Sequence, residues 1–231
     1  IEKSMTAKHL AIIDYGMGNL HSVASAIKCV APDVRVDITA DEKIIEQADH
    51  VIFPGVGAIR DCMIGINDIA AGKMVSRALA AGKPLLGICV GLQALMTGSE
   101  ENGGIDCLNI LDGHVRRFPD NAKDTDGSQI KIPHMGWNNV QQTIDHPLWK
   151  NIEQNARFYF VHSYYVSEKG LSSQQQTNNE SSIVAGRCDY GVPFAAAVAK
   201  DNLFAVQFHP EKSHTDGLQL LKNFVNWNGQ V

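Results

Sequence analysis

One stretch of the sequence indicates the fold more clearly than any other: Leu85-Leu86-Gly87-Ile88-Cys89-Val90-Gly91-Leu92-Gln93. It begins with a short apolar run that is typical of a buried parallel strand, and it continues into a pattern that predicts a helix over 90–96. The junction has the G-x-C-x-G pattern of a nucleophile elbow, with cysteine in place of serine. In open α/β sheets such a junction lies where ligands bind, at the carboxyl end of a strand, so the motif indicates both a fold class and a place for the site.

The elbow predicts a reactive cysteine at Cys89. The flanking glycines leave room for a strained turn that exposes the side chain. A cysteine at the start of a helix also meets the positive end of the helix dipole and unpaired N–H groups, which favour the thiolate. A buried, unreactive cysteine fits the same motif, because free cysteines are often buried. The motif alone leaves both interpretations open.

The segment Gln207-Phe208-His209-Pro210-Glu211 supplies the base that a cysteine nucleophile needs. Strand side chains alternate, so His209 and Glu211 are expected on one side of an extended segment, and Pro210 disfavours helical geometry at His209. The carboxylate can then orient one imidazole nitrogen while the other faces Cys89. The segment also fits a plain turn. Its occurrence together with the elbow favours a catalytic triad, because both segments end strands.

An oxyanion hole is the third requirement. The elbow provides one donor, the backbone N–H of Val90. The glycine-rich turn Pro54-Gly55-Val56-Gly57 follows a buried strand, and its N–H groups are expected to point into the same crevice. A simple connection between a strand and a helix is the alternative interpretation of this turn.

The first hundred residues alternate between strand and helix patterns, which predicts a mostly parallel sheet covered on both faces. We expect strands at 9–15, 34–38, 50–53 and 85–88, helices at 19–30, 59–69, 73–81 and 90–96, and a short helix capped by Asp41. From 109 onward we expect strands at 110–118, 130–133, 157–166, 182–189, 194–199 and 203–209, a solvated loop over 170–182 and a final helix over 217–227. The predicted fold is α/β: one three-layer α/β/α domain over 1–231, flavodoxin-like, with a strand-rich second half. Residues 1–9 are expected to be a flexible start or the remnant of a tag.

Composition excludes several classes of function. The 231 residues are 44% hydrophobic and 19% charged, as in an ordinary globular protein, and the formal charge of −5 argues against nucleic-acid binding. The longest apolar stretch, 84–96, is well short of the ~18–20 residues that span a bilayer, and the start does not resemble a secretory signal. We therefore expect a cytoplasmic protein.

The remaining cysteines provide a contrast to Cys89. Cys62 recurs with apolar residues at helical spacing and is expected in the core. Cys29, Cys107 and Cys188 lack a glycine-flanked junction, and no CxxC pair occurs, so free thiols in a reducing cytosol are expected. His209, Glu211 and His214 do not form a known metal-ligand motif, and we predict no metal and no cofactor.

The motifs resemble those of a known family. Gly87-Ile88-Cys89-Val90-Gly91-Leu92-Gln93 with His209-Pro210-Glu211 is similar to the class I glutamine amidotransferases. The stretches 12–20, 53–58, 133–138 and 159–165 further resemble the branch that forms the glutaminase subunits of imidazole glycerol phosphate synthases, which act in histidine biosynthesis. Val90-Gly91-Leu92 departs mildly from the usual Leu-Gly-Met, by apolar exchanges that keep the backbone donor.

The resemblance implies a glutaminase. Cys89 would attack the side-chain amide of glutamine, with His209 as base and then acid and Glu211 as its orienter. By family analogy, Gln93, Ser163 and Tyr164 contact glutamine, while Val56 and Gly57 form the oxyanion strand beside Val90. The ammonia would pass to a separate (β/α)8-barrel cyclase subunit, the partner in a heterodimer.

Several residues keep two interpretations. Trp137 is expected either in the core or at the interface with the cyclase subunit, and the turn containing Asn19 is expected to line that partner face. His134 and His162 fit either a supporting role near the site or hydrogen-bonded positions in the core. A cysteine peptidase and a non-catalytic regulatory module remain the competing functions.

Overall fold

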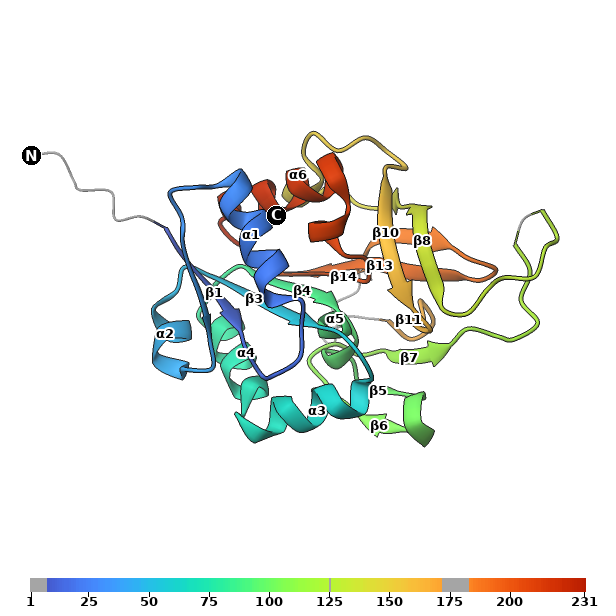
Figure 1. Ribbon diagram of the computed structural model, residues 1–231, viewed down its shortest axis with the longest axis horizontal. Helices are drawn as coiled ribbons and strands as arrows, with labels where there is room; N and C mark the ends of the chain where they lie inside the picture. The colour runs from blue at the N-terminus through green and yellow to red at the C-terminus, as the bar shows by residue number, and fades with distance from the viewer. Residues whose placement is uncertain (1–7, 125, 172–182) are drawn as a thin grey trace, which may run out of the picture.

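The computed structural model, shown in Figure 1, describes residues 8–124, 126–171 and 183–231. An eight-stranded sheet runs through it in the order β2-β1-β3-β4-β14-β13-β12-β9. The first five of these strands are parallel, namely β2 (Arg35–Thr39), β1 (His9–Ile13), β3 (His50–Gly55), β4 (Leu85–Cys89) and β14 (Leu203–Val206). The last three are antiparallel, namely β13 (Pro193–Lys200), β12 (Val184–Asp189) and β9 (Gln141–Gln142). The sheet is therefore mixed, with its parallel half formed mostly by the first half of the chain.

Helices cover both faces of the parallel half (Figure 1). On one face α1 (Leu20–Val30) packs against α6 (His214–Asn226). On the other lie α2 (Glu42–Gln47), α3 (Ile59–Asp68) and α4 (Ala71–Ala80), and α5 (Val90–Ala94) follows β4 directly. This arrangement confirms the predicted α/β/α layers. Asp41 caps α2, as expected, by accepting a hydrogen bond from the Lys43 N–H at 2.8 Å.

Burial explains why the central strands read as unbroken apolar runs. Every residue of β1, β3, β4 and β14 is buried, because both faces of these strands are covered. Each fully buried Leu, Ile or Phe side chain contributes about 1.5–3 kcal/mol relative to an exposed one. The helices bury only one stripe each, such as Leu220, Leu221 and Phe224 on α6.

Two smaller sheets lie at the side of the main sheet where its antiparallel strands are (Figure 1). One pairs β8 (His134–Asn139) with β10 (Arg157–His162). The other has the order β11-β7-β5-β6 and contains β11 (Tyr164–Val166), β7 (His114–Arg117), β5 (Gly98–Ser99) and β6 (Ile105–Asp106). Three 3-10 turns, η1 (Glu101–Gly103), η2 (Pro147–Trp149) and η3 (Pro210–Lys212), complete the elements. Ser163 lies between β10 and β11, so these two strands pass from one small sheet to the other beside the elbow.

Several predicted strands in this half were wrong in extent. Residues 130–133 lie outside any strand, and β8 begins one residue later, because Pro133 offers no N–H to a ladder. Residues 110 and 111 do not belong to β7; their N–H groups donate to the Leu95 carbonyl at the end of α5. The expected strand 157–166 is two strands, and 203–209 ends at Val206. The expected loop at 170–182 lies almost wholly outside the described residues, as do residues 1–7, whereas His9 already belongs to β1.

In the described part of the chain, no helix has the length and apolar character needed to cross a bilayer.

Two core histidines make the stability of this fold depend on pH. His50 and His146 are 4% and 2% exposed, and burial lowers the pKa of each to about 4. The unfolded chain therefore binds more protons than the folded chain between pH 6.5 and pH 4. Their contribution to the free energy of unfolding is fully present above pH 6.5. It falls by up to about 1.4 kcal/mol per pH unit for each group as the pH drops from 6.5 toward 4.

We expect urea unfolding at pH 7, 6 and 5 to show a falling free energy of unfolding. A His50→Gln variant, which does not titrate in this range, should show a shallower slope. A free energy that stayed constant between pH 6.5 and pH 5 would contradict this account.

Candidate active site

Cys89 ends β4 in a backbone conformation that few residues adopt. Its φ of 55° and ψ of −113° place it in a strained region, as a nucleophile elbow requires. A Cβ on Gly91 would lie 2.0 Å from the Phe53 carbonyl oxygen, and one on Gly87 would lie 2.8 Å from the Cβ of Ala205. No side chain larger than hydrogen fits at either position. The two glycines of the motif are thus required by close backbone packing.

The imidazole of His209 is held by a buried carboxylate. His209 Nδ1 lies 2.8 Å from Glu211 Oε1, and the two side chains are 4% and 0% exposed. Asn19 Nδ2 donates to the same carboxylate oxygen at 3.1 Å. The pair forms differently from the prediction: His209 is extended, but Glu211 lies in η3, so a tight turn, and not strand alternation, brings the carboxylate under the ring.

The charge states of His209 and Glu211 are set by their neighbours. Burial opposes the charged form of His209, but the Cys89 thiolate, hydrogen bonds to Cys89 and Glu211, and the Glu211 charge raise its pKa to about 10. Burial likewise opposes ionisation of Glu211, but its hydrogen bond to His209 and the charge of that ring lower its pKa. The neighbours of His209 thus favour the charged form of its ring, and His209 favours the charged form of Glu211.

Backbone contacts fix the position of His209. Its N–H donates to the Tyr159 carbonyl at 2.9 Å, and its own carbonyl accepts from the Ser213 hydroxyl at 2.6 Å. The same hydroxyl accepts from the Tyr159 N–H at 2.9 Å. Tyr159 of β10 and Ser213, which precedes α6, therefore hold His209 in place after the end of β14.

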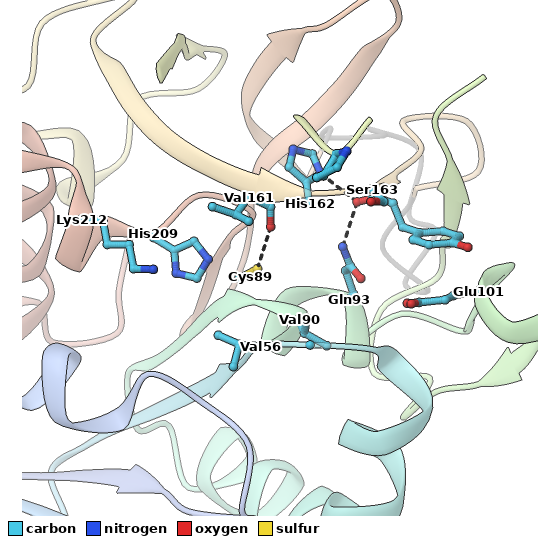
Figure 2. A pocket seen from close by; sticks show the side chains of 13 residues that line it. Val56, Cys89, Val90, Gln93, Glu101, Val161, His162, Ser163, His209 and Lys212 are labelled. Atoms are coloured by element: carbon cyan, nitrogen blue, oxygen red, sulfur yellow. Dashed lines mark hydrogen bonds between the residues drawn. The ribbon is translucent and has the colours of Figure 1, made fainter. Parts of the chain in front are cut away.

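A cavity of about 420 Å³ opens beside Cys89. Figure 2 shows Cys89 between His209 on one side and Gln93 on the other. The predicted site residues that line this cavity are Val56, Gly57, Cys89, Val90, Gln93, Ser163, Tyr164 and His209. Glu101, Pro133, Val161, His162 and Lys212 also line it, and none of these five was predicted as a substrate contact. The cavity has room for a small amino acid next to the sulfur.

Two buried side chains donate hydrogen bonds to the backbone of residues 54–57. β3 stays in register with β4 up to the pair Gly55 and Cys89, so Pro54 and Gly55 of the expected turn still belong to the strand, and only Val56 and Gly57 lie beyond its end, beside the elbow. The Tyr15 hydroxyl donates to the Pro54 carbonyl at 2.7 Å, and the Cys62 thiol donates to the Val56 carbonyl at 3.3 Å. Burial raises the pKa of both groups, that of Cys62 to about 11, so both remain donors at neutral pH.

Polar groups also surround the sulfur. Gln207 Nε2 lies 3.7 Å from Cys89 Sγ, and Cys89 Sγ lies 3.9 Å from the Val161 carbonyl oxygen, a contact marked in Figure 2. Gln93 Nε2 donates to the Tyr164 carbonyl and to Gln207 Oε1, each at 2.9 Å. Gln93 is thus fixed at the wall of the cavity.

The two residues predicted at a partner face lie in different surroundings. Trp137 is half-buried, and its ring stacks on His214 with a centroid distance of 5.0 Å. Met135, on the same strand, is 62% exposed. Asn19, the residue before α1, instead donates to the carboxylate of Glu211.

His134 and His162 form a buried pair. Their rings are joined by a hydrogen bond of 2.9 Å between His134 Nδ1 and His162 Nε2, and His162 Nδ1 donates to the Tyr164 carbonyl at 2.8 Å. Among the described residues, no three His, Cys, Asp or Glu side chains come together as metal ligands. Cys62 and Cys188 are buried, Cys107 is partly buried and Cys29 is exposed, and all five cysteines are unpaired.

Sequence reasoning missed Tyr15, Gln207 and the contact between Asn19 and Glu211. Tyr15 and Asn19 lie in the loop between β1 and α1, far from Cys89 and His209 in sequence, and only the order of the strands brings them close. Gln207 begins the segment 207–211, and its position two residues before His209 is the one sequence signal that places it near that histidine. On a strand, that spacing predicts the same face of the sheet.

Comparison with known proteins gives consistent results. Residues 11–227 match the family model described as "Glutamine amidotransferase class-I". The chain is 53% identical over 220 residues to "Imidazole glycerol phosphate synthase subunit HisH" of Acinetobacter baylyi, covering 95% of this chain and 98% of that protein. It is 54% identical to the protein of the same name from Pseudomonas putida, covering 96% and 98%.

Solved structures show the fold. A protein from Thermoplasma acidophilum, described as part of a putative GMP synthase, superimposes with a TM-score of 0.63 at 16% identity, covering 95% of this chain and 93% of that one. A structure described as a glutamine amidotransferase gives a TM-score of 0.64, also at 16% identity, covering 95% and 98%. At this identity the likeness concerns the arrangement of elements alone.

The support of the 54–57 turn by Tyr15 is testable. Tyr15→Phe leaves the buried Pro54 carbonyl without its donor, which should cost about 1–3 kcal/mol in the free energy of unfolding. Tyr190→Phe is a matched control, because Tyr190 donates to the exposed Lys131 carbonyl, which water can satisfy instead. Urea unfolding of both variants should show the larger loss for Tyr15→Phe. Equal small losses would show that the hydroxyl does not support the turn.

Proposed function

This chain belongs to the class I glutamine amidotransferase family, and from that membership and the geometry at the elbow we propose that Cys89, His209 and Glu211 form its catalytic triad. The chain is the glutaminase subunit of an imidazole glycerol phosphate synthase, the enzyme of its relatives and a step of histidine biosynthesis. One observation carries the assignment of the triad: a cysteine in the elbow conformation faces a histidine that a buried carboxylate orients.

The proposed reaction begins with attack of the Cys89 thiolate on the side-chain amide carbon of glutamine. The C–N bond breaks as the imidazolium of His209 gives its proton to the leaving nitrogen, which departs as ammonia. A γ-glutamyl thioester remains on Cys89. Water then attacks it, His209 takes a proton from that water, and glutamate leaves as the thiolate is restored. The sum is glutamine and water giving glutamate and ammonia.

Backbone donors would stabilise the negative oxygen of each tetrahedral intermediate. Val90 N–H is one donor by its position after the nucleophile. Val56 and Gly57 line the same cavity, and the turn that contains them begins opposite Cys89 in the sheet. We assign them as the second part of the oxyanion hole. Anchoring of this turn by Tyr15 and Cys62 supports that role.

The glutamine contacts are proposed from the cavity lining. Gln93, Ser163 and Tyr164 line its wall, and Figure 2 shows Gln93 and Ser163 on the side away from His209. The amide nitrogen of Gln93 is fully engaged with protein acceptors, so its oxygen is the group offered to a donor on the substrate.

Membership in a synthase of several subunits implies a partner for this chain. We propose that the partner is the (β/α)8-barrel cyclase, that it receives the ammonia, and that the face with Trp137 and Asn19 contacts it. Exposed Met135 beside half-buried Trp137 on β8 supports an apolar contact there. Five unpaired cysteines support a reducing cytoplasm as the working compartment.

Replacement of the nucleophile tests the proposal. Cys89→Ala should lower glutamine-dependent synthesis by at least about a thousandfold, because no thioester forms. Synthesis from added ammonium by the complex with the cyclase should remain. Cys29→Ala, which removes an exposed cysteine outside the site, is the matched control and should keep both activities. Glutamine turnover by Cys89→Ala at the wild-type rate would refute the assignment.

The partner is expected to raise the glutaminase rate. The glycine-rich turn at 54–57 permits more than one peptide orientation, and a bound partner can select the productive one. Glutamate release by the pure chain, measured with and without the cyclase and its nucleotide, should differ by about 5- to 150-fold. Equal rates would contradict this coupling.

A further inference from the structure

A buried row of hydrogen bonds ends at the Cys89 sulfur, and the reaction scheme above does not use it. Gln207 is 0% exposed and points its Nε2 at Cys89 Sγ, 3.7 Å away. Its Oε1 accepts from Gln93 Nε2 at 2.9 Å. Gln93 Nε2 also donates to the Tyr164 carbonyl at 2.9 Å. Both ends of the Gln207 amide are therefore engaged, one of them by the nucleophile.

The Tyr164 carbonyl fixes the direction of this row, because a carbonyl oxygen only accepts hydrogen bonds. Gln93 must turn its NH2 group toward Tyr164, and the second proton of that group then points at Gln207. Gln207 has to offer its oxygen to Gln93, which leaves its own NH2 group for Cys89. If the Gln207 amide were flipped, its NH2 group would face the NH2 group of Gln93, and its oxygen would face the sulfur of Cys89.

The same carbonyl fixes a second, uncharged row. His162 Nδ1 donates to it at 2.8 Å, so His162 Nε2 is bare and accepts from His134 Nδ1 at 2.9 Å. His134 Nε2 then accepts from Asn138 Nδ2 at 3.4 Å. Burial lowers the pKa of His162 to about 3 and that of His134 to about 4, so both rings are neutral at physiological pH. This neutral row fixes the Tyr164 carbonyl, and through that carbonyl it helps to fix the orientation of the Gln93 and Gln207 amides.

We propose that Gln207 is a further catalytic residue, whose amide N–H stabilises the thiolate of Cys89 and holds the sulfur facing the cavity. The inference rests on the proposed role of Cys89 as the nucleophile. A sulfur that has given its proton to His209 is a pure acceptor, and the Gln207 N–H is directed at it. Hydrogen bonds to charged acceptors are about twice as strong as those to neutral ones, so this contact favours the thiolate over the thiol.

The test measures the ionisation of Cys89 and does not depend on glutamine turnover. Iodoacetamide reacts with thiolates, and mass spectrometry of the peptide that contains Cys89 follows its alkylation against pH in the full chain. Gln207→Met keeps an unbranched side chain of similar length without a donor. We expect the pH midpoint of alkylation to rise by about one unit, which slows the reaction about tenfold below the midpoint.

Two further variants make the result decisive. Gln207→Glu keeps an acceptor for Gln93 and nearly the same shape, but it replaces the donor by a negative charge, so its midpoint should rise further than that of Gln207→Met. It also decides the question if Gln207→Met does not fold, which circular dichroism will show. Gln219→Met is the matched control, because Gln219 contacts Asn223 on α6, away from the site, and its midpoint should equal that of the wild type.

Folded Gln207 variants with the wild-type midpoint would overturn the inference, even where Cys89→Ala is inactive and the proposed function stands. Conversely, full glutamine turnover by Cys89→Ala would overturn the proposed function and leave the alkylation result unaffected. The two failures are therefore distinguishable.

Discussion

The close approach of Gly91 to the Phe53 carbonyl is the constraint on which the site depends. A Cβ at Gly91 would lie 2.0 Å from that oxygen, so the first turn after Cys89 packs directly on the backbone of β3. This contact holds Cys89 in its strained conformation at the end of β4. Because β3 and β14 flank β4, the segment with Val56 and Gly57 lies on one side of the sulfur and the segment leading to His209 on the other. The order of the strands thus brings these groups together around the sulfur.

Burial around the sulfur selects which groups are charged. His209 is buried, yet it keeps its proton because Cys89 and Glu211 provide negative charge beside it. His162 lines the same cavity without such a partner, and burial keeps it neutral. Two histidines within one site therefore serve different purposes, and the difference comes from their neighbours. The neutral pair adds fixed dipoles and no charge that would compete with the imidazolium.

The extent to which sequence predicted the structure varied along the chain. The first half followed its hydrophobic pattern closely, because buried parallel strands and amphipathic helices are local signals. In the second half, the segment 130–133 proved to lie outside any strand, because Pro133 offers no N–H to a ladder, and residues 110 and 111 hydrogen-bond to the end of α5 instead of extending β7. The pairing of His209 with Glu211 was predicted, but for an extended segment, whereas the 3-10 turn after Pro210 produces it.

Local patterns in the sequence were enough to indicate the elbow, the layers of the fold and the proposed triad, because each is written in a short motif or in a period of two or 3.6 residues. Only the tertiary structure decided which polar groups support them. Asn19 reaches Glu211, Tyr15 reaches Pro54, and Gln207 lies between Gln93 and Cys89. These contacts join residues that are far apart in the chain. A buried polar side chain takes whichever partner the packed strands bring within hydrogen-bond distance, and no local pattern encodes that choice.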